Sequence, residues 1–192
     1  MKLRLKKFFL FSVMWPHILT FYLSKNRKII REDVARRRIY ISYNYENDFT
    51  AYLCEVLWRD KEYRNLFYLR VGRAISIFLN MILPAMEDVD LAGCSTIGGG
   101  LVLLHGHGII INKYSVIGKN CTIYHEVTIG AIENGLPPKI GDNVYIGCGA
   151  KVLGHIRIGN NVKIGAGAVV VKDVPDNATV VGVPARIVKQ TV

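Results

Sequence analysis

Three of the five histidines in this 192-residue chain, His105, His107 and His125, lie in one short stretch. An imidazole titrates near neutral pH, so it can take a proton from a hydroxyl group at pH 7. Three imidazoles together can also ligate zinc. Glu126 follows His125 directly, where a carboxylate can orient a neighbouring ring. A lone histidine is most often a solvated surface residue, so the surrounding sequence must decide between these uses.

That surrounding sequence repeats with a period of six. An aliphatic residue opens each unit, glycine often follows it, and the fifth residue is small or β-branched. The thirteen openers are Leu91, Ile97, Leu103, Ile111, Ile117, Ile123, Ile129, Ile140, Ile146, Val152, Ile158, Ile164 and Val170. This is the hexapeptide pattern of a parallel β-helix, in which three units form a triangular turn of about 18 residues. Successive turns then stack about 4.8 Å apart.

The period is interrupted twice. Leu103 and Ile111 are eight residues apart, and Ile129 and Ile140 are eleven apart. We therefore expect two extra residues near Ile109 and a projecting loop around residues 135–139. These insertions are candidate functional sites, because function concentrates in loops on a rigid scaffold. His105 and His125 are both third in their units, and those units are three apart. The spacing therefore predicts that these two rings stack on successive turns.

The first 90 residues have a different composition. They hold sixteen of the nineteen aromatic residues but one of the eighteen glycines. Apolar stretches at residues 8–23 and 49–83 predict helices, the second ended by Pro84. The predicted fold is mainly β, with an N-terminal helical region (1–90) followed by a parallel β-helix domain (91–192). The C-terminal tail of that domain is expected to run back along the prism.

The net charge of +10 favours anionic partners, such as a phosphorylated cofactor, a membrane surface or nucleic acid. The sequence shows no motif of an RNA- or DNA-binding module, so nucleic acid is not expected. Residues 8–23 are too few to span a bilayer, which takes about 20 residues. Basic residues precede them, so this helix is either part of a core or lies on an anionic leaflet. No signal-peptide cleavage site follows.

The cysteines are spaced unlike a metal or disulfide motif. They are Cys54, Cys94, Cys121 and Cys148, and no two form a CxxC pair. Reduced thiols of this kind are typical of a cytoplasmic protein. We therefore expect a cytoplasmic location, with contact to the inner face of the membrane if the first helix lies on it.

Two groups of motifs resemble known families. Residues 164–170, 172–175 and 182–186 are similar to the left-handed β-helix acyltransferases. Residues 103–109 and 121–130 resemble serine acetyltransferases and the related O-acetyltransferases of surface-polysaccharide pathways. The resemblance covers roughly residues 59–189. It implies a left-handed coil, a homotrimer with active sites between neighbouring prisms, acetyl-CoA as the donor, and no metal.

The resemblance also assigns roles to the site residues. His105 matches the general base that deprotonates the acceptor hydroxyl. No covalent enzyme nucleophile is needed because a thioester is already activated, and glycine N–H groups suit the oxyanion. His125 and Glu126 are second-tier catalytic candidates that would orient His105 or the acceptor. His107 and Asp60 are the candidates for acceptor binding.

Five further residues match positions that face coenzyme A in related enzymes. Cys148 and Ala166 are separated by the length of three units, so they should stack and leave a groove for the pantetheine arm. Lys172, Arg186 and Lys189 can pair with the phosphates of the cofactor.

The acceptor is inferred from departures from the serine-specific pattern. Leu104 stands where those enzymes have an aspartate, and Pro137 where they have a second histidine. Loss of a charge-assisted contact removes about 1.5–3 kcal/mol. These departures favour a sugar hydroxyl of a surface polysaccharide or its precursor, with L-serine as the alternative. A zinc lyase on the same prism and a non-enzymatic membrane scaffold are the remaining possibilities.

Overall fold

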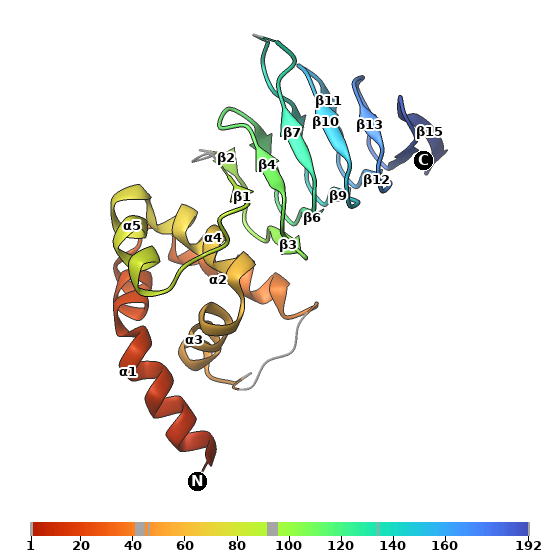
Figure 1. The fold of residues 1–192 in the computed structure, drawn as a ribbon. Coiled ribbons are helices and arrows are strands. Elements are labelled where there is room, and N and C mark those ends of the chain that lie inside the picture. The colour runs from red at the N-terminus through yellow and green to blue at the C-terminus, as the bar shows by residue number, and fades with distance from the viewer. Residues whose placement is uncertain (1, 41–44, 46, 92–95, 134, 192) are drawn as a thin grey trace. The chain divides into compact units, whose positions relative to one another are not determined.

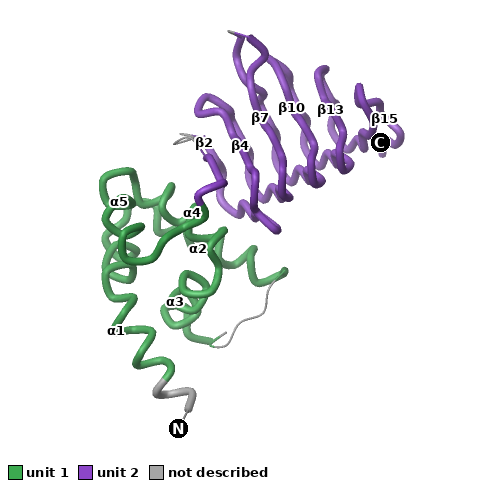
Figure 2. Tube along the Cα trace, viewed as in Figure 1, with its two compact units in different colours: residues 1–86 green, residues 87–192 purple. Residues whose placement is uncertain are grey.

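The protein consists of two compact units in a computed structural model that describes residues 2–40, 45, 47–91, 96–133 and 135–191. Figure 2 shows residues 1–86 as the helical unit and residues 87–192 as the β unit. The change in composition places the boundary at residue 90 instead. The difference arises because Val89–Asp90 is the first strand of the β unit. Cys94 falls outside the described residues.

Within its described residues, the helical unit contains five helices. They are α1 (Lys2–Leu23), α2 (Arg27–Arg37), α3 (Phe49–Arg59), α4 (Lys61–Val71) and α5 (Arg73–Ile82) (Figure 1). The expectation of one long helical stretch over residues 49–83 is corrected here, since the stretch breaks at Asp60 and Gly72. Asp60 adopts extended backbone angles and accepts a hydrogen bond from the Tyr63 N–H, which starts α4. Gly72 has φ +95°. Helix α5 ends just before Pro84, as predicted.

Buried ion pairs join the helices of this unit. Arg70 donates to Asp33 at 3.0 Å, and Arg37 lies 2.6 Å from the carboxylate of Asp60. All four side chains are at most 7% exposed. Removing one partner of such a pair leaves a buried charge uncompensated, so the pairs fix how α2 packs on α4. Among the described residues, no helix is both long and apolar enough to cross a membrane.

The β unit is a parallel β-helix, whose described strands form three sheets (Figure 1). The first sheet contains β1 (Val89–Asp90), β4 (Ile109–Ile111), β7 (Thr128–Gly130), β10 (Lys151–Leu153) and β13 (Val169–Val170). The second contains β2 (Thr96–Ile97), β5 (Val116–Ile117), β8 (Lys139–Ile140) and β11 (Arg157–Ile158). The third contains β3 (Val102–Leu104), β6 (Thr122–Tyr124), β9 (Tyr145–Ile146), β12 (Lys163–Ile164), β14 (Ala178–Val181) and β15 (Arg186–Gln190).

The strand register confirms the predicted repeat. Lys151 pairs with Val169, so a turn without an insertion has the length of three hexapeptide units. The turn that contains the first interruption is longer by two residues, as the pairing of Val102 with Thr122 shows. The turn that contains the second is longer by five, as the pairing of Thr128 with Lys151 shows. The described openers of the repeat are all buried and form the aliphatic core of the prism.

A ladder of asparagines holds one corner of the prism. Asn120, Asn143, Asn161 and Asn177 all have φ between +56° and +60°. The Asn143 amide donates to Asn161, and the Asn161 amide donates to Asn177 at 2.9 Å. Asparagine tolerates left-handed backbone better than most residues. The same residue can therefore adopt the backbone angles of the corner and hydrogen-bond through its amide to the next turn.

The C-terminal tail extends the third sheet. Strand β14 pairs in parallel with β12, and β15 returns antiparallel to β14. The tail was expected to run back along the prism, whereas it forms a two-stranded edge at the last turn.

We predict that Asn161→Ala destabilises the β unit more than Asn161→Gly. Both variants lose the amide ladder, at a cost of about 1 kcal/mol. The alanine variant loses about 1 kcal/mol more of the free energy of unfolding, because alanine is strained in the left-handed backbone that glycine adopts freely. Thermal unfolding followed by circular dichroism checks the order. Equal melting temperatures for the two variants would show that the backbone angle at Asn161 is not a constraint.

His17 makes the stability of the helical unit depend on pH. Its buried ring lies 3.1 Å from the Tyr68 hydroxyl, which donates to the Leu83 carbonyl at 2.6 Å. Burial, followed by the charge of Arg64, lowers the pKa of His17 from 6.5 to about 4. The unfolded chain therefore binds a proton more readily than the folded chain between these two values. Stability is complete above pH 6.5 and decreases as the pH falls toward 4.

We expect the free energy of unfolding to fall by about 1.4 kcal/mol per pH unit below pH 6.5 through this histidine. Urea titrations followed by tryptophan fluorescence report on this unit, because Trp15 and Trp58 are the two tryptophans of the chain. His17→Gln should remove most of the slope on the acid side of neutrality. An unchanged slope in that variant would assign the effect to other groups.

Candidate active site

The first insertion lies at His105 and Gly106, and not near Ile109 as expected. On its N-terminal side Leu104 pairs with Tyr124, and on its C-terminal side Ile110 pairs with Thr128. Five residues, 105–109, therefore separate these two paired positions, whereas only three residues, 125–127, separate their partners in the next turn. Ile109 is fully buried as a regular strand residue, so the two extra residues must be accommodated at the corner before it.

The insertion changes which histidines stack. His107 lies on His125, with ring centroids 4.9 Å apart and an interplanar angle of 6°. The expected pair, His105 and His125, is 6.3 Å apart at 71°. The prediction of a stacked His105–His125 pair is therefore wrong. The two extra residues move His105 out of the ladder, and His107 takes the place above His125.

His105 stands at the exposed corner created by the insertion. Its backbone has φ +53°, and its carbonyl accepts a hydrogen bond from the His107 N–H at 2.8 Å. The ring of Tyr124 lies 6.4 Å away. An exposed imidazole on a fixed backbone corner is accessible to a ligand hydroxyl, as a general base must be.

One edge of the prism carries His107, His125, Cys148 and Ala166 in a column. The Glu126 N–H donates to the His107 carbonyl, the Gly149 N–H to His125 and the Gly167 N–H to Cys148. Cys148 and Ala166 therefore stack as the spacing predicted. We call these four residues the edge column. The column places His107 and His125 in line with Cys148 and Ala166, the two residues expected to contact the donor. The separate sequence motifs did not reveal this relation.

The corner next to the edge column is built from left-handed residues. Gly108, Glu126, Gly149 and Gly167 have φ values of +61°, +58°, +69° and +65°. At Gly149 and Gly167 the backbone is bare, so a ligand can approach the peptide groups. Glu126 takes the same backbone angles with an exposed side chain, and its carbonyl accepts from the Lys151 amine at 2.6 Å.

Sequence reasoning missed three residues near this corner. The Asp88 carboxylate accepts a hydrogen bond from the Gly108 N–H at 3.3 Å, and it precedes the first recognisable repeat. Tyr124 occupies a unit position that is usually glycine, which was a usable signal. Lys151 bridges the Glu126 carbonyl and the Thr128 hydroxyl, and nothing in the repeat marks it out.

The three predicted phosphate-binding cations are exposed at the last turn. The Ala185 N–H donates to the Val169 carbonyl at 2.8 Å, which places the start of β15 beside β13. Arg186 and Lys189 lie on that strand, and Lys172 follows β13. They are therefore positioned at the end of the prism to which Ala166 belongs.

Asp60 lies in the helical unit and is 6% exposed. One carboxylate oxygen pairs with Arg37, and the other caps α4 through the Tyr63 N–H. Both oxygens thus have structural partners in the described chain. The acceptor-binding role expected of Asp60 gains no support from this placement.

Within the described ranges, no group of three or more His, Cys, Asp or Glu side chains is arranged to hold a metal ion.

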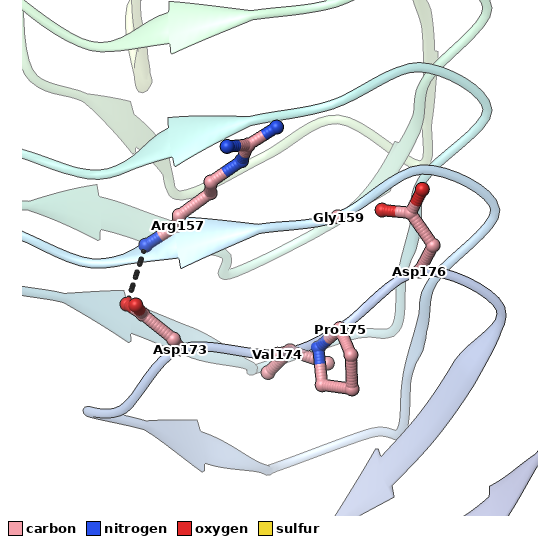
Figure 3. Close-up of a pocket in the computed structure, with 6 residues that line it drawn as sticks. All are labelled: Arg157, Gly159, Asp173, Val174, Pro175 and Asp176. Carbon is pink, nitrogen blue, oxygen red and sulfur yellow. Dashed lines mark hydrogen bonds between the residues drawn. The ribbon is translucent and has the colours of Figure 1, made fainter.

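A shallow depression lies on another face of the prism. It is lined by Arg157, Gly159 and residues 173–176 (Figure 3). There the Arg157 N–H donates to Asp173 at 2.8 Å, and none of the predicted site residues takes part.

Known proteins share this fold and much of this sequence. Residues 137–172 match the family model described as bacterial transferase hexapeptide (six repeats). The solved serine acetyltransferase of Neisseria gonorrhoeae in complex with serine is 35% identical, with a TM-score of 0.68, over 83% of this chain and 68% of that one. This chain belongs to the serine acetyltransferase family of left-handed β-helix acyltransferases. The family assignment accounts for both the repeat and the helical unit that precedes it.

Curated serine acetyltransferases agree with the assignment. The enzyme of Staphylococcus aureus (strain Mu50 / ATCC 700699) is 53% identical over 122 residues, which are 62% of this chain and 55% of that protein. A probable serine acetyltransferase of Oryza sativa subsp. japonica is 44% identical over 118 residues, 60% of this chain and 39% of that one. The chain spans about half the length of the curated relatives that it matches.

These comparisons overturn the preference for a polysaccharide acceptor. That preference rested on Leu104 and Pro137, two positions at which single contacts differ from the serine-specific pattern. The similarity to serine acetyltransferases extends over more than a hundred residues, and it supports the alternative that was kept open. The absence of two contacts shows that the acceptor is held differently. It does not show that the acceptor belongs to another chemical class.

We predict that Ala166→Phe weakens binding of acetyl-CoA at least tenfold with little change in melting temperature. Ala166 is exposed and stacks on Cys148, so a large ring covers the surface expected to hold the pantetheine arm and leaves the core intact. Lys163→Phe, at an exposed position on β12, is the matched control. Isothermal titration with coenzyme A measures the effect. Equal affinity of Ala166→Phe and the wild type would remove the edge column from the donor site.

Proposed function

We propose that this chain is an acetyl-CoA-dependent serine O-acetyltransferase of cysteine biosynthesis. The observation that carries the proposal is the edge column, which aligns the stacked rings of His107 and His125 with Cys148 and Ala166. The ring of the exposed His105 lies 6.3 Å from the ring of His125. The similarity to serine acetyltransferases over both units supports L-serine as the acceptor.

His105 acts as the general base in this mechanism. Its neutral imidazole takes the proton of the serine hydroxyl as the oxygen attacks the thioester carbonyl. The resulting tetrahedral oxyanion is stabilised by N–H groups at the glycine corners, and it collapses with release of the coenzyme A thiolate. The proton held by the imidazole then passes to that thiolate. Acetyl transfer is direct, because the thioester needs no prior activation by the protein.

His107, His125 and Glu126 support the base. Glu126 presents an exposed carboxylate at the same corner, two turns before Gly167. These residues orient the acceptor and His105 in the proposed complex.

The acceptor must be held differently from the pattern expected for this family. Leu104 and Pro137 are apolar and buried, so they offer no charge to the serine ammonium or carboxylate. Asp88 accepts a hydrogen bond from the Gly108 N–H, and Glu126, whose side chain is exposed, is the residue of the next turn in register with Gly108. We assign the ammonium contact to these two carboxylates. The role of Asp60 in acceptor binding stays a prediction.

The donor and the assembly follow from the same family. Cys148 and Ala166 flank the pantetheine arm, and Lys172, Arg186 and Lys189 pair with the phosphates. We propose a homotrimer whose sites lie between neighbouring prisms, and a cytoplasmic location where acetyl-CoA is available. No disulfide joins the three described cysteines, which suits a reducing compartment. Burial raises the pKa of the Cys54 thiol to about 12, so that thiol is unreactive.

The decisive assay measures thiol release from acetyl-CoA with L-serine, free sugars and nucleotide sugars. We expect turnover with L-serine and none above hydrolysis with the sugars. His105→Ala should lower kcat about 10²–10⁴-fold with nearly unchanged affinity for coenzyme A. His155→Ala, an exposed histidine in a regular unit, serves as the control. An unaltered kcat in His105→Ala would exclude His105 as the base, and inactivity with L-serine would refute the acceptor.

A further inference from the structure

The outer face of α1 is apolar from Phe8 to the end of the helix. Exposed residues follow each other at helical spacing there, and large apolar side chains occupy every such position but Ser12. The exposed fractions are 75% for Phe8, 60% for Trp15, 49% for Leu19, 46% for Tyr22 and 75% for Leu23. We call these five residues the α1 stripe.

The opposite face of the same helix explains why the stripe is not part of the core. Leu10, Met14, His17 and Phe21 are at most 2% exposed and recur at the same helical spacing. Helix α1 is therefore already anchored by its inner face, and its outer face is an additional apolar surface. Contiguous apolar patches of this kind mark interaction sites on proteins and membranes.

The helical unit that carries the stripe is strongly cationic. Residues 1–86 contain 16 of the 25 basic residues and 7 of the 15 acidic residues. In the described part of the helical unit, every acidic side chain is buried or half-buried. The exposed charges there are Lys6, Lys25, Arg27, Lys28, Arg31, Arg59, Lys61 and Arg73. A partner for this surface must combine an apolar interior with negative charge.

We propose that the α1 stripe docks the protein on an anionic phospholipid surface, with α1 lying in the plane of the interface. Trp15 and Tyr22 are amphipathic aromatics, which favour the boundary between acyl chains and headgroups. The Lys6 amine is held by Glu55 at 3.2 Å, whereas the exposed Lys25 and Lys28 follow the stripe, so long cationic side chains can reach the headgroups at its C-terminal end. At about 1.5 Å per residue, the 22 residues of α1 present a long, shallow contact. This inference does not depend on the acceptor.

Vesicle sedimentation with the full chain tests the proposal. We expect binding to vesicles made of two parts phosphatidylcholine and one part phosphatidylglycerol, and at least tenfold weaker binding to phosphatidylcholine alone. Binding to the mixed vesicles should be lost in about 0.5 M salt. The double variant W15S/L19S should bind at least tenfold more weakly, and K25E/K28E should lose the preference for anionic lipid. Y114S/I132S, which removes two exposed apolar side chains from the β unit, is the matched control.

A fluorescence measurement reports on the stripe directly. Trp58→Phe leaves Trp15 as the single tryptophan, and its emission should shift to the blue on mixing with anionic vesicles. Absence of the shift, or wild-type binding by W15S/L19S, would overturn the proposal. A change of oligomeric state in W15S/L19S without loss of vesicle binding would assign the stripe to a second copy of the chain and would equally overturn it. Serine acetylation by each variant is measured in parallel, so failure of the function and failure of docking are distinguishable.

Discussion

The parallel ladder between successive turns is the constraint on which the β unit depends. Each turn must bring backbone N–H and C=O groups opposite those of the next turn, and each opener must reach the interior at the same place. A turn without an insertion does this with three hexapeptide units and nothing more. Any extra residue therefore has to leave the ladder at a corner. The site is a consequence of this rule, since His105 and Gly106 are the residues that leave it.

The rule also explains the geometry of the edge column. Once two residues have left the ladder, His107 and not His105 continues the stack onto His125. The column then runs without interruption through Cys148 to Ala166. A flat imidazole pair at one end and small side chains at the other create a surface along which a long thioester can lie. The proposed chemistry needs little more than an exposed base beside that surface.

Much of the fold could be predicted because its determinants are local and periodic. The openers define the strands and the turn length, and Pro84 ends the last helix. The breaks at Asp60 and Gly72 were missed, because a cap and a left-handed residue are single-residue events inside an apolar pattern. The position of the first insertion was also missed. A gap of eight residues shows that two are extra, but the pairing of both flanking strands is needed to show which two.

The candidate site residues were chosen from the sequence by type and spacing, and the structure adds their contacts. His105, Cys148 and Ala166 follow from motif and spacing, whereas Asp88 and Lys151 act through hydrogen bonds to backbone groups distant in the sequence. The acceptor class was misjudged for a related reason. Leu104 and Pro137 report which contacts are missing, and they do not report which other groups replace them.

A crystal structure with bound acetyl-CoA would show directly whether the edge column and His105 form one site. We expect the pantetheine arm to lie along Cys148 and Ala166, with the thioester carbonyl within contact distance of the His105 ring. A thioester held away from that ring in every protomer would contradict this expectation.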